Sequence, residues 1–199
     1  METNNKEKIL KILVKNPLQK HTITSLAEET KISRPGTWKI LKKLESEELI
    51  KLSPIGSGRT NTNLINLNWQ NPLTEKTLEL ILTKEALEHQ KWRFNFEKLE
   101  KEVDFSILFG SILHSPKQAN DIDIINVVKR NKFVEIDKIL TKMQVSQKKD
   151  IHSINLTEIE FKKELQNKNK AYIDAIKKGI VLFGQENFVQ FIKKIQNGN

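Results

Sequence analysis

The 199-residue sequence predicts an α+β protein, in which a mainly helical N-terminal part precedes a mixed sheet with packed helices. In the first 48 residues, apolar side chains recur at helical spacing with polar residues between them. Beyond residue 103, short runs rich in Ile, Val and Phe alternate with helical patterns, which is typical of strands packed against helices. Asn71-Pro72 is typical of a helix start, so we expect domains at 1–70 and 101–199 joined by a helical linker at 71–100.

The N-terminal domain is predicted to contain three helices followed by two strands. The expected order is a helix at 5–15, a helix at 25–30, a helix from Ser33, a strand at 49–52 and a strand at 63–69. Ser33 fits a helix N-cap, and Pro35 fits the first turn because its missing N–H would have no partner there. The segment 53–60 between the strands is rich in Gly, Ser and Pro, so we expect a loop.

This order of three helices and a hairpin resembles the winged helix-turn-helix family of DNA-binding domains, and the Ser33-Arg34-Pro35 entry to the third helix is similar to that of family members. The resemblance implies that the third helix lies in the major groove, while the hairpin tip approaches the minor groove or a phosphate. The residues that it places against DNA are Ser33, Arg34, Thr37, Lys39, Lys42, Lys43 and Arg59, with Lys43 on the phosphate backbone. The alternative for the three lysines is a solvated helix face, and Trp38 fits a core position as well as a DNA contact.

The charge balance favours a polyanionic partner. Residues 1–70 carry twelve Lys and Arg residues against seven acidic ones, and the whole chain has a formal net charge of +9. A basic excess of this kind favours nucleic acid, while a solvated lysine-rich surface is the common alternative.

The composition excludes several classes of protein. The chain has no cysteine, so it contains neither disulfides nor thiolate metal sites. Hydrophobic residues make up 37% of the chain and charged residues 30%, which predicts modest cores. No apolar stretch approaches membrane-spanning length, and the N-terminus lacks the pattern of a signal peptide. We therefore expect a cytoplasmic protein without a membrane partner.

A glycine-serine pair followed by two aspartates is the most informative feature of the C-terminal domain. Gly110-Ser111 follows one apolar run, and Asp121 and Asp123 open the next. Because strand side chains alternate between faces, the two carboxylates point the same way. They repel each other unless a hard cation lies between them, and Mg²⁺ is an ion that such oxygen ligands hold beside substrate phosphates. Gly110 lets the backbone approach a ligand, and the Ser111 hydroxyl fits a phosphate oxygen.

This pattern resembles the signature of the DNA polymerase β-like nucleotidyltransferases, and most closely their small members, the minimal nucleotidyltransferases. The likeness covers about residues 100–199. It implies a Mg²⁺ site at Asp121 and Asp123, contacts from Gly110 and Ser111 to the triphosphate of an NTP, and a third carboxylate on a later strand. The alternative is that the two aspartates are exposed strand ends and that Gly110-Ser111 is a turn.

The chain departs from the family pattern in three places. Segment 112–120 holds neither the Arg nor the second Gly that many members carry, and Asn120 stands where Ser is common. The third carboxylate is expected at Asp150, at the entry of a strand over 150–156, so the predicted catalytic and metal-binding residues are Asp121, Asp123 and Asp150. If His152 occupies that position instead, the site has two carboxylates and its activity is in doubt.

The two domains together predict a DNA-binding protein with a Mg²⁺-dependent nucleotidyltransferase domain, which transfers a nucleoside monophosphate from an NTP to a protein, RNA or small-molecule acceptor. One alternative is a transcription regulator whose transferase-like domain senses a nucleotide with little or no turnover. Another is an antitoxin-type nucleotidyltransferase, since minimal members are often paired with a small helical RNase toxin. The linker helix either connects the two domains or mediates a homodimer, as winged helices often dimerise to bind two half-sites.

Overall fold

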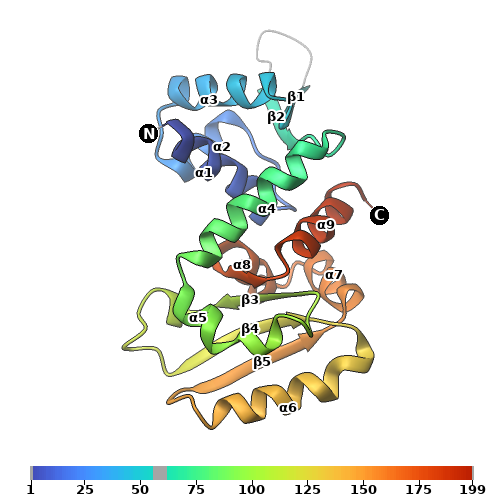
Figure 1. Cartoon of the computed structure of the whole chain (residues 1–199). Coiled ribbons are helices and arrows are strands. Elements are labelled where there is room, and N and C mark those ends of the chain that lie inside the picture. Colours follow the sequence, from blue (N-terminus) through green and yellow to red (C-terminus); the bar gives the residue numbers. More distant parts are fainter. Residues whose placement is uncertain (1, 56–61, 199) are drawn as a thin grey trace. The chain divides into compact units, whose positions relative to one another are not determined.

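The computed structural model describes residues 2–55 and 62–198, and the chain divides into two compact units. Unit 1 comprises Met1–Ile81 and Ile192–Asn199, and unit 2 comprises Leu82–Phe191. The two points of division fall within helices α4 (Pro72–Leu87) and α9 (Gln185–Gln196), which are labelled in Figure 1. Each unit has buried apolar residues of its own.

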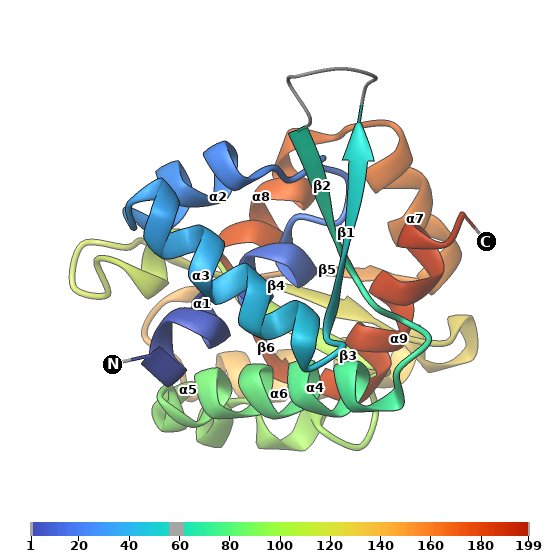
Figure 2. The same ribbon diagram turned by 90° about the horizontal axis from the view of Figure 1, so that it is seen from above.

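Unit 1 begins with three helices and an antiparallel hairpin. They are α1 (Glu2–Lys15), α2 (Ile23–Thr30), α3 (Arg34–Ser46), β1 (Ile50–Ile55) and β2 (Thr62–Leu67). The hairpin pairs Ile50 with Leu67 and Ile55 with Thr62 at its two ends, and Figure 2 shows the two strands side by side. This order confirms the prediction of three helices and a hairpin for the N-terminal part of the chain. The core lies where the helices meet, and its most buried side chains include Ile9, Leu13, Leu26, Leu41 and Leu44.

The turn between α2 and α3 is fixed by local chemistry at both helix ends. Lys31 adopts a left-handed backbone conformation with a φ of 60°, which ends α2. Ser33 then caps α3, because its hydroxyl accepts a hydrogen bond from the backbone N–H of Gly36 at 3.3 Å. This confirms Ser33 as the N-cap predicted from the sequence. A Cβ at position 36 would lie 3.0 Å from Ile32 Cγ2, so glycine allows the helix to start close to the turn.

Unit 2 contains a four-stranded mixed sheet. Its strands are β3 (Phe105–Phe109), β4 (Asp121–Val127), β5 (Asp150–Leu156) and β6 (Ile180–Phe183), in the spatial order β5-β4-β3-β6. Strand β3 is antiparallel to β4 and β6, whereas β4 and β5 run parallel. A parallel pair needs a long crossover connection, and helix α6 (Phe133–Gln144) supplies it here. The predicted α+β class with a mixed sheet is thus confirmed.

Helices cover both faces of this sheet (Figure 1). On one face, α6 shares a core with α5 (Gln90–Asn95) and the 3-10 turn η1 (Glu97–Leu99). The other face holds α7 (Glu158–Gln166), α8 (Lys170–Lys178) and the first part of α9. An aromatic cluster fills that layer: the ring of Phe161 stacks on Phe191 with centroids 5.3 Å apart, and Phe105 lies 5.4 Å from both Phe188 and Phe191. The edge-to-face and stacked contacts of such rings add to their burial.

The helical pattern that we expected to continue through the linker at 71–100 is broken in the structure. Helix α4 ends at Leu87, and α5 starts after His89, whose ψ of 42° is not helical. The break turns Trp92, Phe96 and Leu99 into the core of unit 2. Burial of these large side chains outweighs continuation of a single helix, because tertiary packing supplies most of a helix's stability. Within residues 2–55 and 62–198, no helix has both the length and the apolar character that a bilayer crossing requires.

A chain of polar side chains crosses the sheet on the face covered by α6. Ser106 Oγ donates to Asn126 Oδ1 at 2.8 Å, and Asn126 Nδ2 donates to Asn155 Oδ1 at 3.0 Å. Asn155 Nδ2 in turn donates to Asp137 Oδ1 of α6 at 2.7 Å. Ser106 and Asn126 are completely buried. Because buried polar groups need hydrogen-bond partners, this row of hydrogen-bonded side chains favours one register of β3, β4 and β5.

We predict that Asn126→Ala lowers the free energy of unfolding by about 1–3 kcal/mol, because it leaves the buried hydroxyl of Ser106 without its acceptor. Asp137→Ala is the matched control, since it frees the amide of Asn155 at a position that solvent can reach. Urea denaturation followed by circular dichroism measures both variants. Equal losses of stability for the two substitutions would contradict this account.

Candidate functional site

Three strand ends meet at one edge of the sheet in unit 2, and they carry residues predicted from the sequence. Gly110 follows the end of β3, Asp121 and Asp123 open β4, and His152 is the third residue of β5. The strand pairing places Asp123 opposite Phe109 of β3 and opposite His152 of β5. Because directly paired residues of neighbouring strands point to the same face, the two carboxylates and the imidazole share one face of the sheet.

The side chains of Asp121, Asp123 and His152 converge. His152 Nδ1 lies 3.3 Å from Asp121 Oδ2 and 3.8 Å from Asp123 Oδ1. One ligand atom from each of the three residues lies within 4.8 Å of the others, which is close enough for all three to hold one metal ion. Both aspartates are half-buried, so the pair of carboxylates is partly withdrawn from water.

Asp150, which we expected as the third carboxylate, is not part of this group. It pairs with Asp121 at the very start of β5, and its side chain is exposed. Residues two positions apart on a strand share a face but lie about 7 Å apart, so only one of Asp150 and His152 lies next to both aspartates. The structure brings His152 to that place. Sequence reasoning named His152 only as the less favoured alternative, because the spacing alone does not distinguish the two positions.

Gly110 allows the close approach that forms the site. Its φ of 84° lies in the left-handed region, and a Cβ built on it would lie 2.2 Å from Asp123 Oδ2. A side chain at this position would therefore displace the carboxylate as well as strain the backbone. Ser111 is exposed and starts the short helix η2 (Ser111–Leu113), so its hydroxyl can reach a ligand beside the aspartates.

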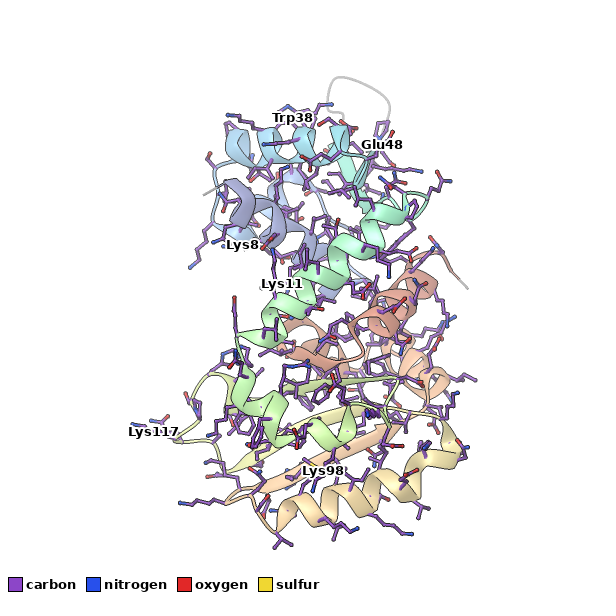
Figure 3. The ribbon with its side chains drawn as sticks, viewed as in Figure 1. Lys8, Lys11, Trp38, Glu48, Lys98 and Lys117 are labelled. Carbon is purple, nitrogen blue, oxygen red and sulfur yellow. The ribbon has the colours of Figure 1, made fainter. Side chains whose placement is uncertain are left out.

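The loop between η2 and β4 is tied to the start of β5 by a residue that the sequence did not single out. Lys149 Nζ donates a hydrogen bond to the backbone carbonyl of Ala119, just before Asp121. Gln144, at the end of α6, also holds the start of β5, because its Oε1 accepts a hydrogen bond from Ile151 N at 2.7 Å. Lys117, at the tip of the same loop, extends away from the sheet (Figure 3). The entries of β4 and β5 are thus fixed relative to each other.

The electrostatics of the site favour a cation. Burial raises the pKa of the Asp123 carboxyl, and the neighbouring charge of Asp121 raises it further, while His152 acts in the opposite direction. Two carboxylates with an unfavourable mutual interaction gain most from a positive ion placed between them. Carboxylate oxygens are the ligands of hard divalent ions, and an imidazole nitrogen extends the choice toward transition metals.

Helix α3 of unit 1 presents the second candidate site. Five of the predicted DNA-contacting residues are exposed on it or at its start: Ser33, Arg34, Lys39, Lys42 and Lys43. Figure 3 shows Trp38 on the side of α3 that faces away from α1, and Lys42 Nζ lies 5.0 Å from the centre of its ring. Lys42 also pairs with Glu45 at 2.8 Å. The sequence allowed Trp38 to be either a core residue or a DNA contact. Its indole is half-buried rather than part of the core.

Thr37 and Arg59 differ from the other predicted DNA contacts. Thr37 is 0% exposed, so its prediction as a direct DNA contact is wrong. It precedes Leu41 and Leu44 at helical spacing, and this places its side chain on the inward face of α3. Arg59 lies outside the described residues. Ser33 uses its hydroxyl as the cap of α3, which leaves its backbone and Arg34 at the helix start facing solvent.

Comparison with known protein families agrees with this arrangement. The winged helix-turn-helix DNA-binding family matches residues 3–51, which span α1, α2, α3 and the start of β1. The chain carries an N-terminal winged helix-turn-helix DNA-binding domain. This domain supports DNA as a partner of the protein. No match was found among curated proteins or among solved structures, so the nucleotidyltransferase resemblance of unit 2 stays a prediction.

For the winged helix domain we predict that Arg34→Ala combined with Lys39→Ala weakens binding to double-stranded DNA and makes it less dependent on salt. Each lost phosphate contact should reduce the slope of log K against log salt by about 0.9. Fluorescence anisotropy with a labelled duplex at several KCl concentrations measures both quantities. Lys117→Ala, in the loop of unit 2, is the control that removes a charge elsewhere. An unchanged slope in the double variant would argue against α3 as the DNA-contacting helix.

For the carboxylate site we predict that Asp123→Asn raises the melting temperature at pH 7 in the presence of EDTA. The raised pKa means that the folded state binds this proton more tightly than the unfolded state does. Protonation of Asp123 therefore stabilises the folded state. This stabilisation is fully present below the unfolded-state pKa and is lost as pH rises through the folded-state pKa. The advantage of the variant should therefore vanish toward low pH. Thermal melts across pH measure it, with Asp150→Asn as the control, and a variant less stable than wild type at pH 7 would contradict the prediction.

Proposed function

We propose that the protein is a DNA-binding regulator whose unit 2 binds a divalent metal ion with a nucleoside triphosphate and transfers the nucleotidyl group to an acceptor. The observation that carries the proposal is the convergence of Asp121 and Asp123 beside Gly110, where a Cβ would lie 2.2 Å from a carboxylate oxygen. Carboxylates that repel each other suit a cation and the phosphates that it accompanies, and glycine at position 110 lets the Asp123 carboxylate lie against the backbone there.

The residues take distinct roles in this proposal. Asp121 and Asp123 hold the ion through their carboxylates, and Gly110, which lacks a Cβ, lets the Asp123 carboxylate lie beside the turn that leads to Ser111. The exposed Ser111 hydroxyl donates to a phosphate oxygen. A divalent ion bound there would neutralise charge on the phosphates and on the leaving pyrophosphate. In the transfer, the oxygen of an acceptor hydroxyl would bond to the α-phosphorus while the bond to the pyrophosphate oxygen breaks, and the hydroxyl proton would pass to water. A protein, an RNA and a small molecule all remain candidate acceptors.

A second candidate function is nucleotide sensing without transfer. It is favoured by the absence of Asp150 from the group formed by Asp121, Asp123 and His152. A site with two carboxylates still binds a metal–nucleotide complex, but it has no third carboxylate to accept the proton of an acceptor hydroxyl. In that case, binding of the nucleotide would act on the winged helix domain and change its affinity for DNA, and the coupling would be reciprocal.

We predict that an NTP with Mg²⁺ stabilises the wild-type protein against thermal unfolding. A ligand present at a hundred times its Kd stabilises the folded state by about 2.7 kcal/mol, and this effect should disappear in Asp121→Ala and Asp123→Ala. The measurement is differential scanning fluorimetry with ATP, GTP, CTP and UTP in turn. Asp150→Ala is the matched control and should keep the effect. A shift that survives the loss of both Asp121 and Asp123 would place the nucleotide elsewhere.

Transfer is tested with NTPs labelled at the α-phosphate and a cell extract as the source of acceptors. Label that becomes attached to an acceptor with wild-type protein, but not with Asp121→Ala, would support nucleotidyl transfer. Binding without transferred label would favour the sensing function. The two functions then separate further through DNA affinity, since the sensing function requires that the NTP changes binding of a labelled duplex.

A further inference from the structure

The third donor of the carboxylate site is a histidine held in place by strand pairing. His152 lies opposite Asp123 in the parallel pairing of β4 with β5. Its side chain is 61% exposed, yet Nδ1 is directed at Asp121 Oδ2 and Asp123 Oδ1. Because the imidazole is exposed, it contributes little to the apolar core. Its position beside two carboxylates suits a polar role such as metal ligation.

The spacing of the three donors suits ligation of one ion. Ligands about 2.1 Å from a shared ion and at right angles to each other lie about 3 Å apart. The distances from His152 Nδ1 to the two carboxylate oxygens are 3.3 and 3.8 Å, and all three donor atoms lie within 4.8 Å of one another. A small closing movement of the side chains would complete the coordination, without any change in strand register.

The start of β5 is supported on both sides, which limits how far His152 can move from the aspartates. Lys149 bonds the carbonyl of Ala119, and Gln144 Nε2 donates to the carbonyl of Lys149 at 3.1 Å. Gln144 also accepts from Ile151 N. These bonds fix the backbone on either side of the strand entry, and such supporting contacts orient the ligands of a metal site.

We infer that His152 is the third metal ligand of this site and that it makes the site prefer a first-row transition ion such as Mn²⁺ to Mg²⁺. The inference rests on the proposed function, which places a divalent ion at Asp121 and Asp123. Imidazole nitrogen suits transition metals, whereas Mg²⁺ prefers oxygen ligands and gives up its waters reluctantly. Mn²⁺ accepts both carboxylate and imidazole donors, and it also accompanies nucleotide phosphates in place of Mg²⁺.

The test uses the full chain and titrates MnCl₂ and MgCl₂ separately by isothermal calorimetry, without nucleotide. His152→Ala should weaken Mn²⁺ binding by at least about tenfold while leaving Mg²⁺ binding nearly unchanged. His152→Asp, which supplies an oxygen donor at the same place, should reverse the preference toward Mg²⁺. His89→Ala is the matched control, because His89 precedes α5 and makes no side-chain capping hydrogen bond there. Circular dichroism checks that each variant is folded.

A spectroscopic measurement gives a direct answer on coordination. Electron spin echo envelope modulation of bound Mn²⁺ detects a ligating nitrogen, and we expect that signal in wild type and in His89→Ala but not in His152→Ala or His152→Asp. A nitrogen signal and Mn²⁺ affinity that survive in His152→Ala would overturn the inference, while metal binding that depends on Asp121 and Asp123 would leave the proposed function standing. If wild type binds neither ion, with or without an NTP, both fail together.

Discussion

The pairing of β4 with its two neighbours is the constraint on which the proposed metal site of unit 2 depends. Because side chains alternate along a strand, a slip of one residue between β4 and β5 would turn His152 away from Asp121 and Asp123. A slip between β3 and β4 would likewise separate Gly110 from Asp123. No single loop builds the site. It forms from three segments that are distant in the sequence, and each contributes one or two groups at the end of a strand.

The two units differ in how much of their function is local. In the winged helix domain, the exposed basic residues lie on one helix, whose start is fixed by Ser33 and Gly36 within a single turn. The site of unit 2 needs a sheet with a correct register before its groups meet. If unit 2 binds a ligand as proposed, the protein has two parts that can respond to different signals, and ligand binding in one can be coupled to DNA binding in the other.

The sequence was sufficient for the features that depend on neighbouring residues. Helical spacing predicted the three N-terminal helices, and alternation placed Asp121 and Asp123 on one face of a strand. It failed at Thr37, where the helical spacing to Leu41 already indicated an inward-facing side chain but the family resemblance placed the residue against DNA. It also failed where long-range packing decides. Asp150 and His152 share a face of β5, so the residue that meets the aspartates could be identified only from the register with β4.

The amides of Asn126 and Asn155 lie on the opposite face of the sheet from the carboxylates, since residues of odd and even number alternate along β4. They nevertheless control where His152 lies, because a misregistered β5 would leave buried amides without partners during folding. The geometry of the group formed by Asp121, Asp123 and His152 therefore depends on side chains that lie on the other face of the sheet. If the proposed metal site exists, its metal preference could change through substitutions on the opposite face of the sheet that leave Asp121, Asp123 and His152 intact.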